Sequence, residues 1–334
     1  YTKNKITGFS QMEINACSSC GICIDACQIQ DVAGRNNMVP AYLFQKIRHG
    51  KVLKPALYDC LVCGRCEEAC PVNINILNIK IAKRNEKLNH KHQQFGYLSQ
   101  INKEPQKAKI AYFAGCMSHL TPSVKKAMVS IFEKTNTPFS FIDEDGSICC
   151  GRPLQLSGRF EDARLLMEKN KQIITESGAE ILVTSCPICY KVFNEEYQLP
   201  VKVLHHTQLF EMWEKEGKLN LKKQSFIASY HDPCDLGRGS KVYNAPRNIL
   251  NQLVTLQETN YKKENSLCCG GSLGNFYFQE KDKVDVAQDA YNKIMAKDSE
   301  MLITACPLCK KTFQKVADKP VFDLAEIVDQ NIKV

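Results

Sequence analysis

The spacing of cysteines constrains this chain more than any other feature. All eighteen cysteines in the 334 residues fall into repeated groups, with none left over. Cysteines this close in sequence are poor disulfide partners but good chelators, and disulfide scaffolds are usually small. This chain is large, and its apolar content of 44% is ordinary for a globular protein. The sequence therefore predicts metal clusters in a reducing compartment.

The first two groups share the spacing C-x2-C-x2-C-x3-C, which is typical of two cubane iron–sulfur clusters. Three close thiolates wrap around one cubane, with Gly21 and Gly64 relieving crowding, and the fourth cysteine serves the other cluster. Zinc is the alternative, although zinc ligands usually come as paired C-x2-C units. We predict two ligand sets, which are Cys17, Cys20, Cys23 and Cys70, and Cys60, Cys63, Cys66 and Cys27.

The rest of the chain is an internal repeat. EILVTSCPICYKVF at 180–193 aligns with EMLITACPLCKKTF at 300–313, with eight of fourteen positions identical. Each copy alternates short apolar strands with amphipathic helices, which predicts parallel sheets with the cysteine loops where strands end and helices begin. Strands are expected at 109–114, 138–142, 181–185, 226–230 and 301–305, and helices at 122–134, 159–177, from Pro187, 245–254 and 281–296.

We predict an α+β chain of three units. A mostly α-helical two-cluster ferredoxin domain (1–102) precedes two α/β, Rossmann-like cysteine-rich modules (107–220 and 221–334). The polar stretch 83–94 is interpreted as an exposed helix end or linker. No run reaches 18 apolar residues and the N-terminus has no signal-peptide core, so we expect a cytoplasmic protein without its own membrane span. The chain does not begin with Met, which fits further residues upstream.

The formal charge of +8 does not indicate a nucleic-acid partner. Clusters held by these eighteen thiolates would add roughly −10, which brings the loaded protein near neutrality. No basic stripe with interleaved aromatic residues is present either, so nucleic-acid binding is not expected.

The repeated five-cysteine groups resemble the CCG cysteine-rich domain of heterodisulfide reductases. That domain is shared with iron–sulfur subunits of glycolate, lactate and glycerol-3-phosphate oxidising systems. The 32-residue gap between the first two groups, and Gln28 instead of proline after Cys27, also resemble helical ferredoxin domains of heterodisulfide reductases and fumarate reductases. The resemblance covers the whole chain.

This resemblance implies that each module holds a noncubane [4Fe–4S] cluster through five cysteines. A zinc site, or an ordinary cubane with a spare cysteine, is the alternative for each module. The implied sets are Cys116, Cys149, Cys150, Cys186 and Cys189 in the first module, and Cys234, Cys268, Cys269, Cys306 and Cys309 in the second.

The resemblance also implies a function. A flavoprotein or other redox subunit would supply electrons through two cubanes to two noncubane clusters, where a disulfide is reduced. Cys150 and Cys269 are the expected reactive-site residues, and His231 is a candidate proton donor, although hydrogen bonding within its loop is the favoured role. The alternative is an electron-transfer subunit between a flavin-dependent hydroxy-acid or glycerol-3-phosphate dehydrogenase and quinone. Either reading allows association with the inner face of the membrane through a partner such as a cytochrome.

Two further motifs lie beside the cluster loops. Arg152 and Arg238 are expected to neutralise charge on a cluster or an anionic substrate. Gly270, Gly271 and Gly274 imitate part of a phosphate-binding loop, but they do not open a helix after a strand, so no nucleotide site is predicted.

Overall fold

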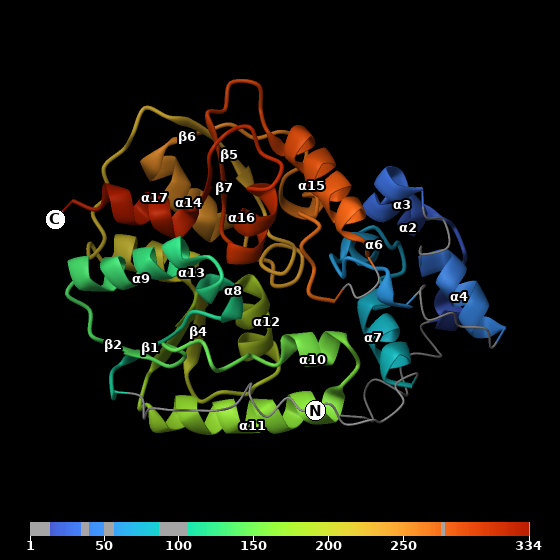
Figure 1. Cartoon of the computed structure of the whole chain (residues 1–334), viewed down its shortest axis with the longest axis horizontal. Coiled ribbons are helices and arrows are strands. Elements are labelled where there is room, and N and C mark those ends of the chain that lie inside the picture. Colours follow the sequence, from blue (N-terminus) through green and yellow to red (C-terminus); the bar gives the residue numbers. More distant parts are fainter. Residues whose placement is uncertain (1–13, 35–39, 50–56, 87–105, 275–277, 334) are drawn as a thin grey trace.

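The structure is a computed structural model, and it describes residues 14–34, 40–49, 57–86, 106–274 and 278–333. Figure 1 shows the N-terminal helices on one side of two lobes that each contain a sheet. The helical character predicted for the N-terminal unit is confirmed. Its helices are α2 (Ile22–Asp25), α3 (Gln28–Ala33), α4 (Pro40–Arg48), α6 (Arg65–Glu68) and α7 (Ile76–Glu86).

Each cysteine-rich module is built on a four-stranded parallel sheet. The strand orders β2-β1-β3-β4 and β6-β5-β7-β8 are equivalent, as expected for a duplicated module. The predicted α+β fold with two parallel sheets is therefore confirmed. The strands are β1 (Ile110–Phe113), β2 (Phe139–Phe141), β3 (Ile181–Thr184), β4 (Lys202–His205), β5 (Ile227–His231), β6 (Thr255–Leu256), β7 (Met301–Thr304) and β8 (Val321–Asp323).

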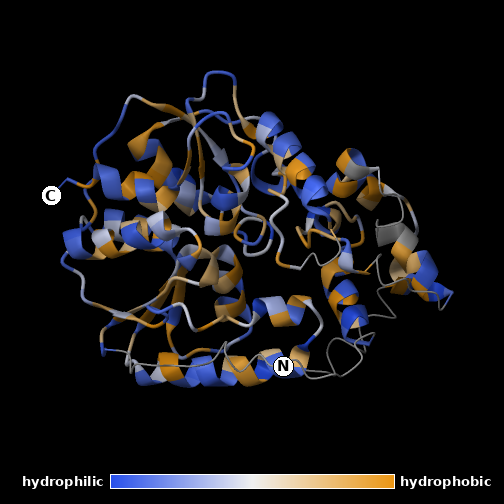
Figure 2. Cartoon of the chain, in the orientation of Figure 1, coloured by the Kyte–Doolittle hydropathy of each residue, from blue (hydrophilic) through white to orange (hydrophobic). Residues whose placement is uncertain are grey.

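The helices of the modules cover these sheets, and those predicted from periodicity are present within two residues of their expected ends. Figure 2 shows hydrophilic and hydrophobic residues alternating along α11 and α15, as amphipathic helices require. The helices are α8 (Cys116–His119), α9 (Pro122–Lys134), α10 (Arg152–Leu156), α11 (Phe160–Glu176), α12 (Pro187–Glu195), α13 (His206–Lys215), α14 (Asn244–Leu253), η3 (Lys263–Asn265), α15 (Glu280–Ile294), α16 (Pro307–Phe313) and α17 (Leu324–Asn331).

The sequence prediction missed the last strand and helix of each module, β4–α13 and β8–α17. The sequences KVLH of β4 and VFD of β8 each contain only two apolar residues, next to each other, so neither strand shows a periodic apolar pattern. A signal was available at α17, because Asp323 and Glu326 form a capping box. His205 caps α13 in the same way, through a residue type that is not usual there.

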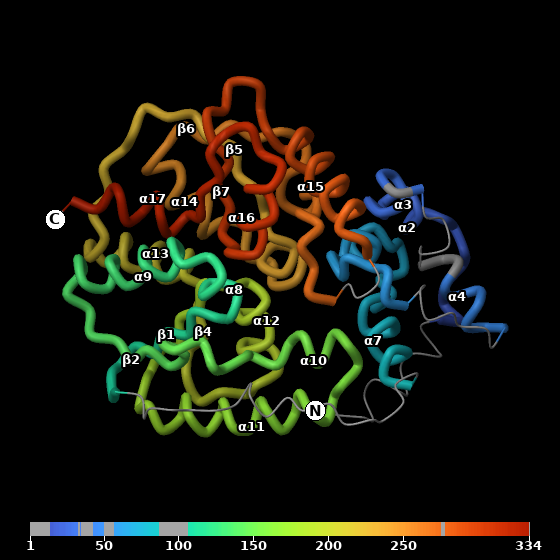
Figure 3. Tube along the Cα trace, in the orientation of Figure 1, coloured from blue at the N-terminus to red at the C-terminus, as the bar shows by residue number. Residues whose placement is uncertain are grey.

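The two modules share one apolar core. Helix α9 packs on α17, and α13 packs on α14, so each module covers the other with equivalent elements. Tyr112, Phe132 and Trp213 of the first module are buried in the same cluster as Ile249 and Val328 of the second. Figure 3 shows the chain returning at α17 to lie beside α9. The modules therefore form a single body, which holds their cysteine loops at fixed positions.

The prediction that residues 83–94 are exposed is wrong at Arg84. Its guanidinium is fully buried: Nε and Nη2 donate to the Leu57 carbonyl at 2.9 and 2.7 Å, and Nη1 donates to the Leu156 carbonyl. Carbonyl oxygens from two segments satisfy its donors, so burial is tolerated. Lys83 and Glu86 form a surface ion pair, and residues 87–94 lie outside the described residues. None of the helices in the described ranges has the length and apolar character needed to cross a bilayer.

Candidate metal centres

Four thiols surround an outer hollow of about 350 Å³ beside α2 and α7. Three come from one cysteine run and the fourth, Cys70, comes from the other. Cys20 is exposed, and Val72 on the rim is 51% exposed, so this hollow, the outer site, lies at the protein surface. The thiols that line it are Cys17, Cys20, Cys23 and Cys70, which is the first set predicted from the sequence.

A second hollow of about 400 Å³, the inner site, has the reciprocal composition. Its thiols are those of Cys27, Cys60, Cys63 and Cys66, the second predicted set. The buried side chain of Lys80 also lines this hollow. Burial alone would lower the pKa of Lys80, but the thiolates of Cys60, Cys66 and Cys27 outweigh burial and raise this pKa.

Each hollow is lined by three cysteines of one run and the fourth cysteine of the other run, and this arrangement can be tested. Cys70→Ser should perturb the EPR signal of the site that contains Cys17, Cys20 and Cys23, because Cys70 lines that hollow. Spectra of the reduced variant and wild type are compared, with Cys27→Ser as the reciprocal variant. If Cys70→Ser and Cys27→Ser altered the same EPR signal, the two runs would not exchange their fourth cysteines.

The first module brings its five cysteines together where β1 and β3 end. Cys116 begins α8 after β1, and Cys186 is the N-cap of α12 after β3. The thiol of Cys149 is hydrogen-bonded to those of Cys116 and Cys150, and Cys150 also bonds Cys189. Hydrogen bonds from Cys149 and Cys189 lower the pKa of Cys150.

Gly115 explains how the loop before Cys116 approaches the other cysteines. Its φ is +84°, and a Cβ atom there would lie 2.9 Å from Cys189 Sγ. Asp143 fixes this loop, since its carboxylate accepts hydrogen bonds from the backbone N–H groups of Ala114 and Gly115, each at 2.7 Å. A side chain at position 115 would displace a predicted ligand.

The second module repeats the arrangement. Cys269 Sγ and Cys309 Sγ are 3.3 Å apart, and hydrogen bonds from Cys268 and Cys309 hold the pKa of Cys269 well below its usual value. The second cysteine of each adjacent pair, Cys150 or Cys269, is therefore the more acidic thiol. All five predicted ligands line a cavity of about 460 Å³: Cys234, Cys268, Cys269, Cys306 and Cys309.

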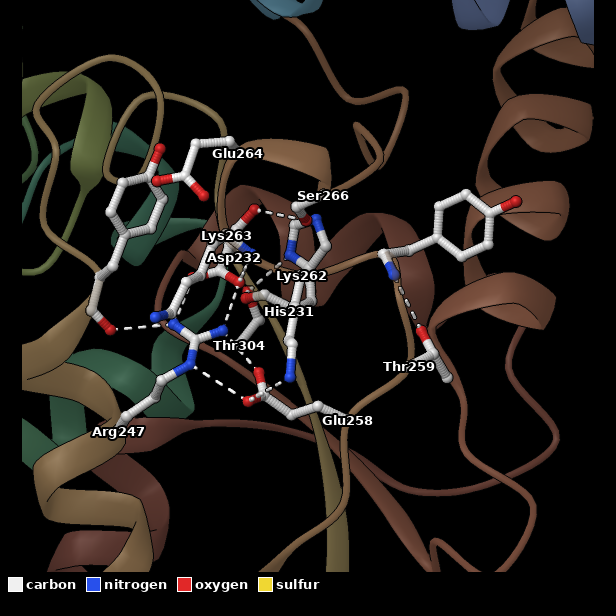
Figure 4. A network of polar contacts seen from close by, with 12 residues as sticks. His231, Asp232, Arg247, Glu258, Thr259, Lys262, Lys263, Glu264, Ser266 and Thr304 are labelled. Atoms are coloured by element: carbon white, nitrogen blue, oxygen red, sulfur yellow. Dashed lines mark hydrogen bonds and ion pairs between the residues drawn. The ribbon is translucent and has the colours of Figure 1, made fainter.

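A buried ionic network holds the loop before Cys234 (Figure 4). Arg247 donates two hydrogen bonds to the Asp232 carboxylate, at 2.8 and 2.7 Å, and also pairs with Glu258. The Asp232 carboxylate accepts from the backbone N–H of Lys263, and the Asp232 carbonyl accepts from Ser266 Oγ. The network thus ties the loop before Cys234 to the segment before Cys268. Its partners are distant in sequence, and no short motif indicates them.

His231 is fully buried beside this network. Nδ1 lies 3.0 Å from Thr304 Oγ1, and Nε2 lies 3.0 Å from the Leu267 carbonyl. Burial lowers the pKa of His231. Among the described residues, His231 is not one that lines the 460 Å³ cavity. This geometry suits hydrogen bonding within the loop, the role favoured from the sequence, and proton donation by His231 stays an untested prediction.

The inner site and the second module are joined directly. The Gln28 side chain donates to the Cys268 carbonyl at 3.0 Å and accepts from the Cys268 N–H at 2.9 Å. Arg238 Nε donates to the Cys63 carbonyl at 2.8 Å, and its Nη1 donates to the Ser266 carbonyl at 2.6 Å. The thiols of Cys63 and Cys268 are hydrogen-bonded, which lowers the pKa of Cys63. The inner site therefore touches the second five-cysteine set.

The other two motifs singled out from the sequence have structural explanations. Arg152 forms an ion pair with Glu196, with Nη1 and Oε1 3.2 Å apart. A Cβ atom at Gly271 would lie 2.4 Å from Thr312 Oγ1, and one at Gly274 would lie 2.7 Å from Val62 Cγ2. The glycines therefore allow close packing of this loop against α16 and the N-terminal unit.

Three parts of the chain meet at the 460 Å³ cavity. Leu61 comes from the N-terminal unit, Pro187 and Ile188 come from the first module, and Leu273 and Leu308 come from the second. Cys186 and Cys306, at equivalent positions in the two modules, are close enough for the charge of one to raise the pKa of the other. Cys186 of the first set therefore lies near Cys306 of the second, while the cavity itself is lined by the thiols of the second set and by Pro187 and Ile188 of the first module.

The donor chemistry of these sites fits iron–sulfur clusters. Iron–sulfur clusters take cysteine thiolates as ligands and are larger than a single ion, so thiols should surround a space. The outer and inner hollows and the 460 Å³ cavity have this form. Within the described ranges, no three or more His, Cys, Asp or Glu side chains form a group that would hold a single metal ion.

Comparison with known proteins finds two families. The cysteine-rich domain, CCG, matches residues 110–194 and 228–314, and the 4Fe-4S dicluster domain matches residues 13–74. An uncharacterized iron-sulfur protein of Methanococcus maripaludis is 26% identical over 83% of this chain, which spans 63% of that protein. A subunit of the dihydromethanophenazine:CoB–CoM heterodisulfide reductase of Methanosarcina barkeri is 25% identical over 98% of this chain and 96% of its own length. EtfAB:quinone oxidoreductase of Syntrophomonas wolfei is 23% identical over 85% of this chain and 48% of its own length.

Proposed function

Because the chain belongs to the family of CCG cysteine-rich domain proteins, with a 4Fe-4S dicluster domain before its two CCG domains, we propose that this iron–sulfur oxidoreductase reduces a disulfide as a subunit of a larger complex. The cavity lined by Cys269 carries the proposal. Both modules and the N-terminal unit contribute to it, and five thiols open onto it. A heterodisulfide reductase subunit matched along nearly its whole length supports the same function.

The proposed cofactors are two cubane [4Fe–4S] clusters, at the outer and inner sites, and two noncubane [4Fe–4S] clusters, at the five-cysteine sets. When bound, such clusters supply one-electron transfer, and iron that can take up sulfur. The predicted ligands are the eighteen cysteines in their four sets, as grouped from the sequence.

The chain's own residues perform three tasks in this proposal. Apolar side chains, among them Leu61, Ile188 and Leu308, exclude water from the reactive cavity. Gln28 and Arg238 hold the inner site against Cys268 and its segment, so that electrons cross a short fixed distance. Cys150 and Cys269 are the proposed reactive-site thiolates, because each is the second cysteine of an adjacent pair and is hydrogen-bonded to the last cysteine of its module's C-P-x-C motif, Cys189 or Cys309.

The outer site is the proposed entry point for electrons. Cys20 and Val72 line its hollow and are exposed, so a partner's redox group can approach it closely. A flavoprotein or another redox subunit is the proposed partner, with a membrane cytochrome or quinone further along the path. Such a partner would place the chain in the cytoplasm, at the inner face of the membrane.

A second candidate function is electron transfer to quinone without a substrate of the chain's own. It is favoured by the similarity to EtfAB:quinone oxidoreductase, although this chain spans about half of that protein. The electron source would then be a flavin-dependent hydroxy-acid or glycerol-3-phosphate dehydrogenase.

Disulfide reduction should be measurable with the isolated chain. Anaerobically purified protein should contain about sixteen irons, four in each of four sites, and should release thiols from at least one member of a panel of cellular disulfides. Reduced viologen supplies the electrons, and thiols are counted colorimetrically.

Two outcomes would contradict the proposal in different ways. About eight irons with one or two zincs would show that the modules do not both hold clusters. A full iron content without thiol release, together with quinone reduction in the presence of a flavoprotein dehydrogenase, would leave electron transfer as the function.

A further inference from the structure

The outer and inner sites differ in the charges around them. Helix α7 passes both hollows: Ile76 lines the outer one, whereas Leu77 and Lys80 line the inner one. Apart from cysteines, the outer hollow is lined by uncharged residues, which within the described ranges are Ser18, Ser19, Gly21, Phe44, Pro71, Val72, Ile74 and Ile76. Among the residues that the structure describes, the charged ones that line the inner hollow are Asp59, Arg65 and Lys80.

Burial makes these charges important. Reduction adds negative charge to a site, and this costs more in a buried environment than beside water. The outer site has the exposed Cys20 and is therefore partly hydrated, whereas Lys80 and Asp59 at the inner site are 3% and 2% exposed. Without a compensating cation the inner site would be the harder of the two to reduce.

Several charges compensate the inner site. Arg84 is close enough to Cys60, and Arg238 to Cys63, for their charges to interact, and Glu67 interacts with Cys66. Together with the lining residues this makes, within the described part of the chain, four cations (Arg65, Lys80, Arg84 and Arg238) and two anions (Asp59 and Glu67). The balance is positive. At the outer site, Arg48 donates to the Cys17 carbonyl, but Arg48 is exposed and its charge is screened by water.

Lys80 differs from the arginines in how its charge is placed. Arg65 donates to the Ala26 and Asn265 carbonyls, and Arg238 donates to the Cys63 and Ser266 carbonyls. These arginines join segments of the backbone. Arg65 and Lys80 both line the hollow, and the charge of Lys80 interacts with those of three thiols of the site, Cys60, Cys66 and Cys27.

We infer that Lys80 raises the reduction potential of the inner site above the value that burial alone would set, so that electrons arriving at the outer site move inward. The inference rests on the proposed cubane at the inner site. Lys80 would act through its positive charge on the inner site, without touching the substrate. Electrons would then move from the surface towards Cys268.

The test is an anaerobic redox titration followed by EPR. In Lys80→Met the inner-site signal should need a lower potential: at a fixed potential its reduced-to-oxidised ratio should fall at least tenfold, which is 59 mV for one electron. The outer-site signal, identified through Cys70→Ser, should keep its midpoint. Lys80→Arg retains the charge and should stay close to wild type.

Lys83→Met is the matched control, because Lys83 lies on the same helix but pairs with Glu86 at the surface. An unchanged inner midpoint in Lys80→Met, or an equal shift in Lys83→Met, would overturn the inference. If Lys80→Met fails to load the inner site, iron content decides: loading restored in Lys80→Arg supports the charge requirement, and loss in both variants contradicts it.

This measurement is separate from disulfide reduction. Two cubane signals in wild type without thiol release would contradict the proposed function. The redox titration of Lys80→Met would still decide whether Lys80 raises the potential of the inner site. A missing inner-site signal in wild type would contradict both.

Discussion

Cys150→Ser and Cys269→Ser should each lower the rate of viologen-driven disulfide reduction at least about 100-fold. Replacing a residue that only supports a metal ligand already lowers activity or metal affinity by about 10- to 100-fold, and these variants replace a predicted ligand itself. Each thiol has a lowered pKa and a hydrogen bond to the C-P-x-C cysteine of its module, Cys189 or Cys309. If a disulfide is split between the two five-cysteine sets, neither module can be dispensed with. Thiol release is the measurement.

The same samples contain their own control, because dithionite should still reduce the outer and inner sites. Ser147→Ala is a matched variant near Cys149, in which a hydroxyl bonded to Asp145 is removed, and it should keep wild-type activity. Wild-type rates in Cys150→Ser would show that the first module is not part of the reactive site.

Gly158→Ala should destabilise the chain by about 3–5 kcal/mol and weaken docking of the N-terminal unit. Gly158 has a φ of +86°, and a Cβ atom there would lie 2.5 Å from the Asn85 backbone nitrogen and 2.8 Å from the Arg84 carbonyl carbon. Both atoms belong to the backbone of α7, so the clash is relieved only by moving that helix away from the first module. Urea unfolding measures the loss of stability.

Gly178→Ala separates the steric effect from backbone strain. Gly178 has a φ of +71° and nothing within 4 Å of the added atom, so this variant bears only the left-handed penalty of about 1–2 kcal/mol. An equal decrease in the free energy of unfolding in Gly158→Ala and Gly178→Ala would mean that a Cβ atom at position 158 does not clash with α7. A larger loss at Gly158, with slower reduction of the module sites by dithionite, is the expected result.

The contacts around α7 explain why these two positions matter for function. Arg84 donates to the Leu156 carbonyl, and Asn85 donates to the Gly158 carbonyl. Leu156 lines the reactive cavity, while Lys80, one turn earlier in α7, lines the inner site. Helix α7 therefore fixes the inner site relative to the cavity, and a shift of the helix would change the distance that electrons must cross.

Sequence alone was sufficient for features that depend on short separations. Chelating loops such as Cys60 to Cys66 need residues three apart, and helices such as α9 and α11 need a 3.6-residue period, so both can be seen in a short window. The duplication was also visible, because two copies of the C-P-x-C segment could be compared. These signals were enough to predict the α+β fold correctly and to propose how the cysteines are grouped.

Tertiary structure decided how the groups meet. Gln28 differs from the proline expected in compact ferredoxins, but its pairing with Cys268, 240 residues away, appears only when the units pack together. Arg84 belongs to a polar stretch that suggested exposure, yet carbonyl groups of Leu57 and Leu156 satisfy it in the interior. Burial and hydrogen bonding between distant segments depend on how the whole chain packs, so a local pattern of residue types does not predict them.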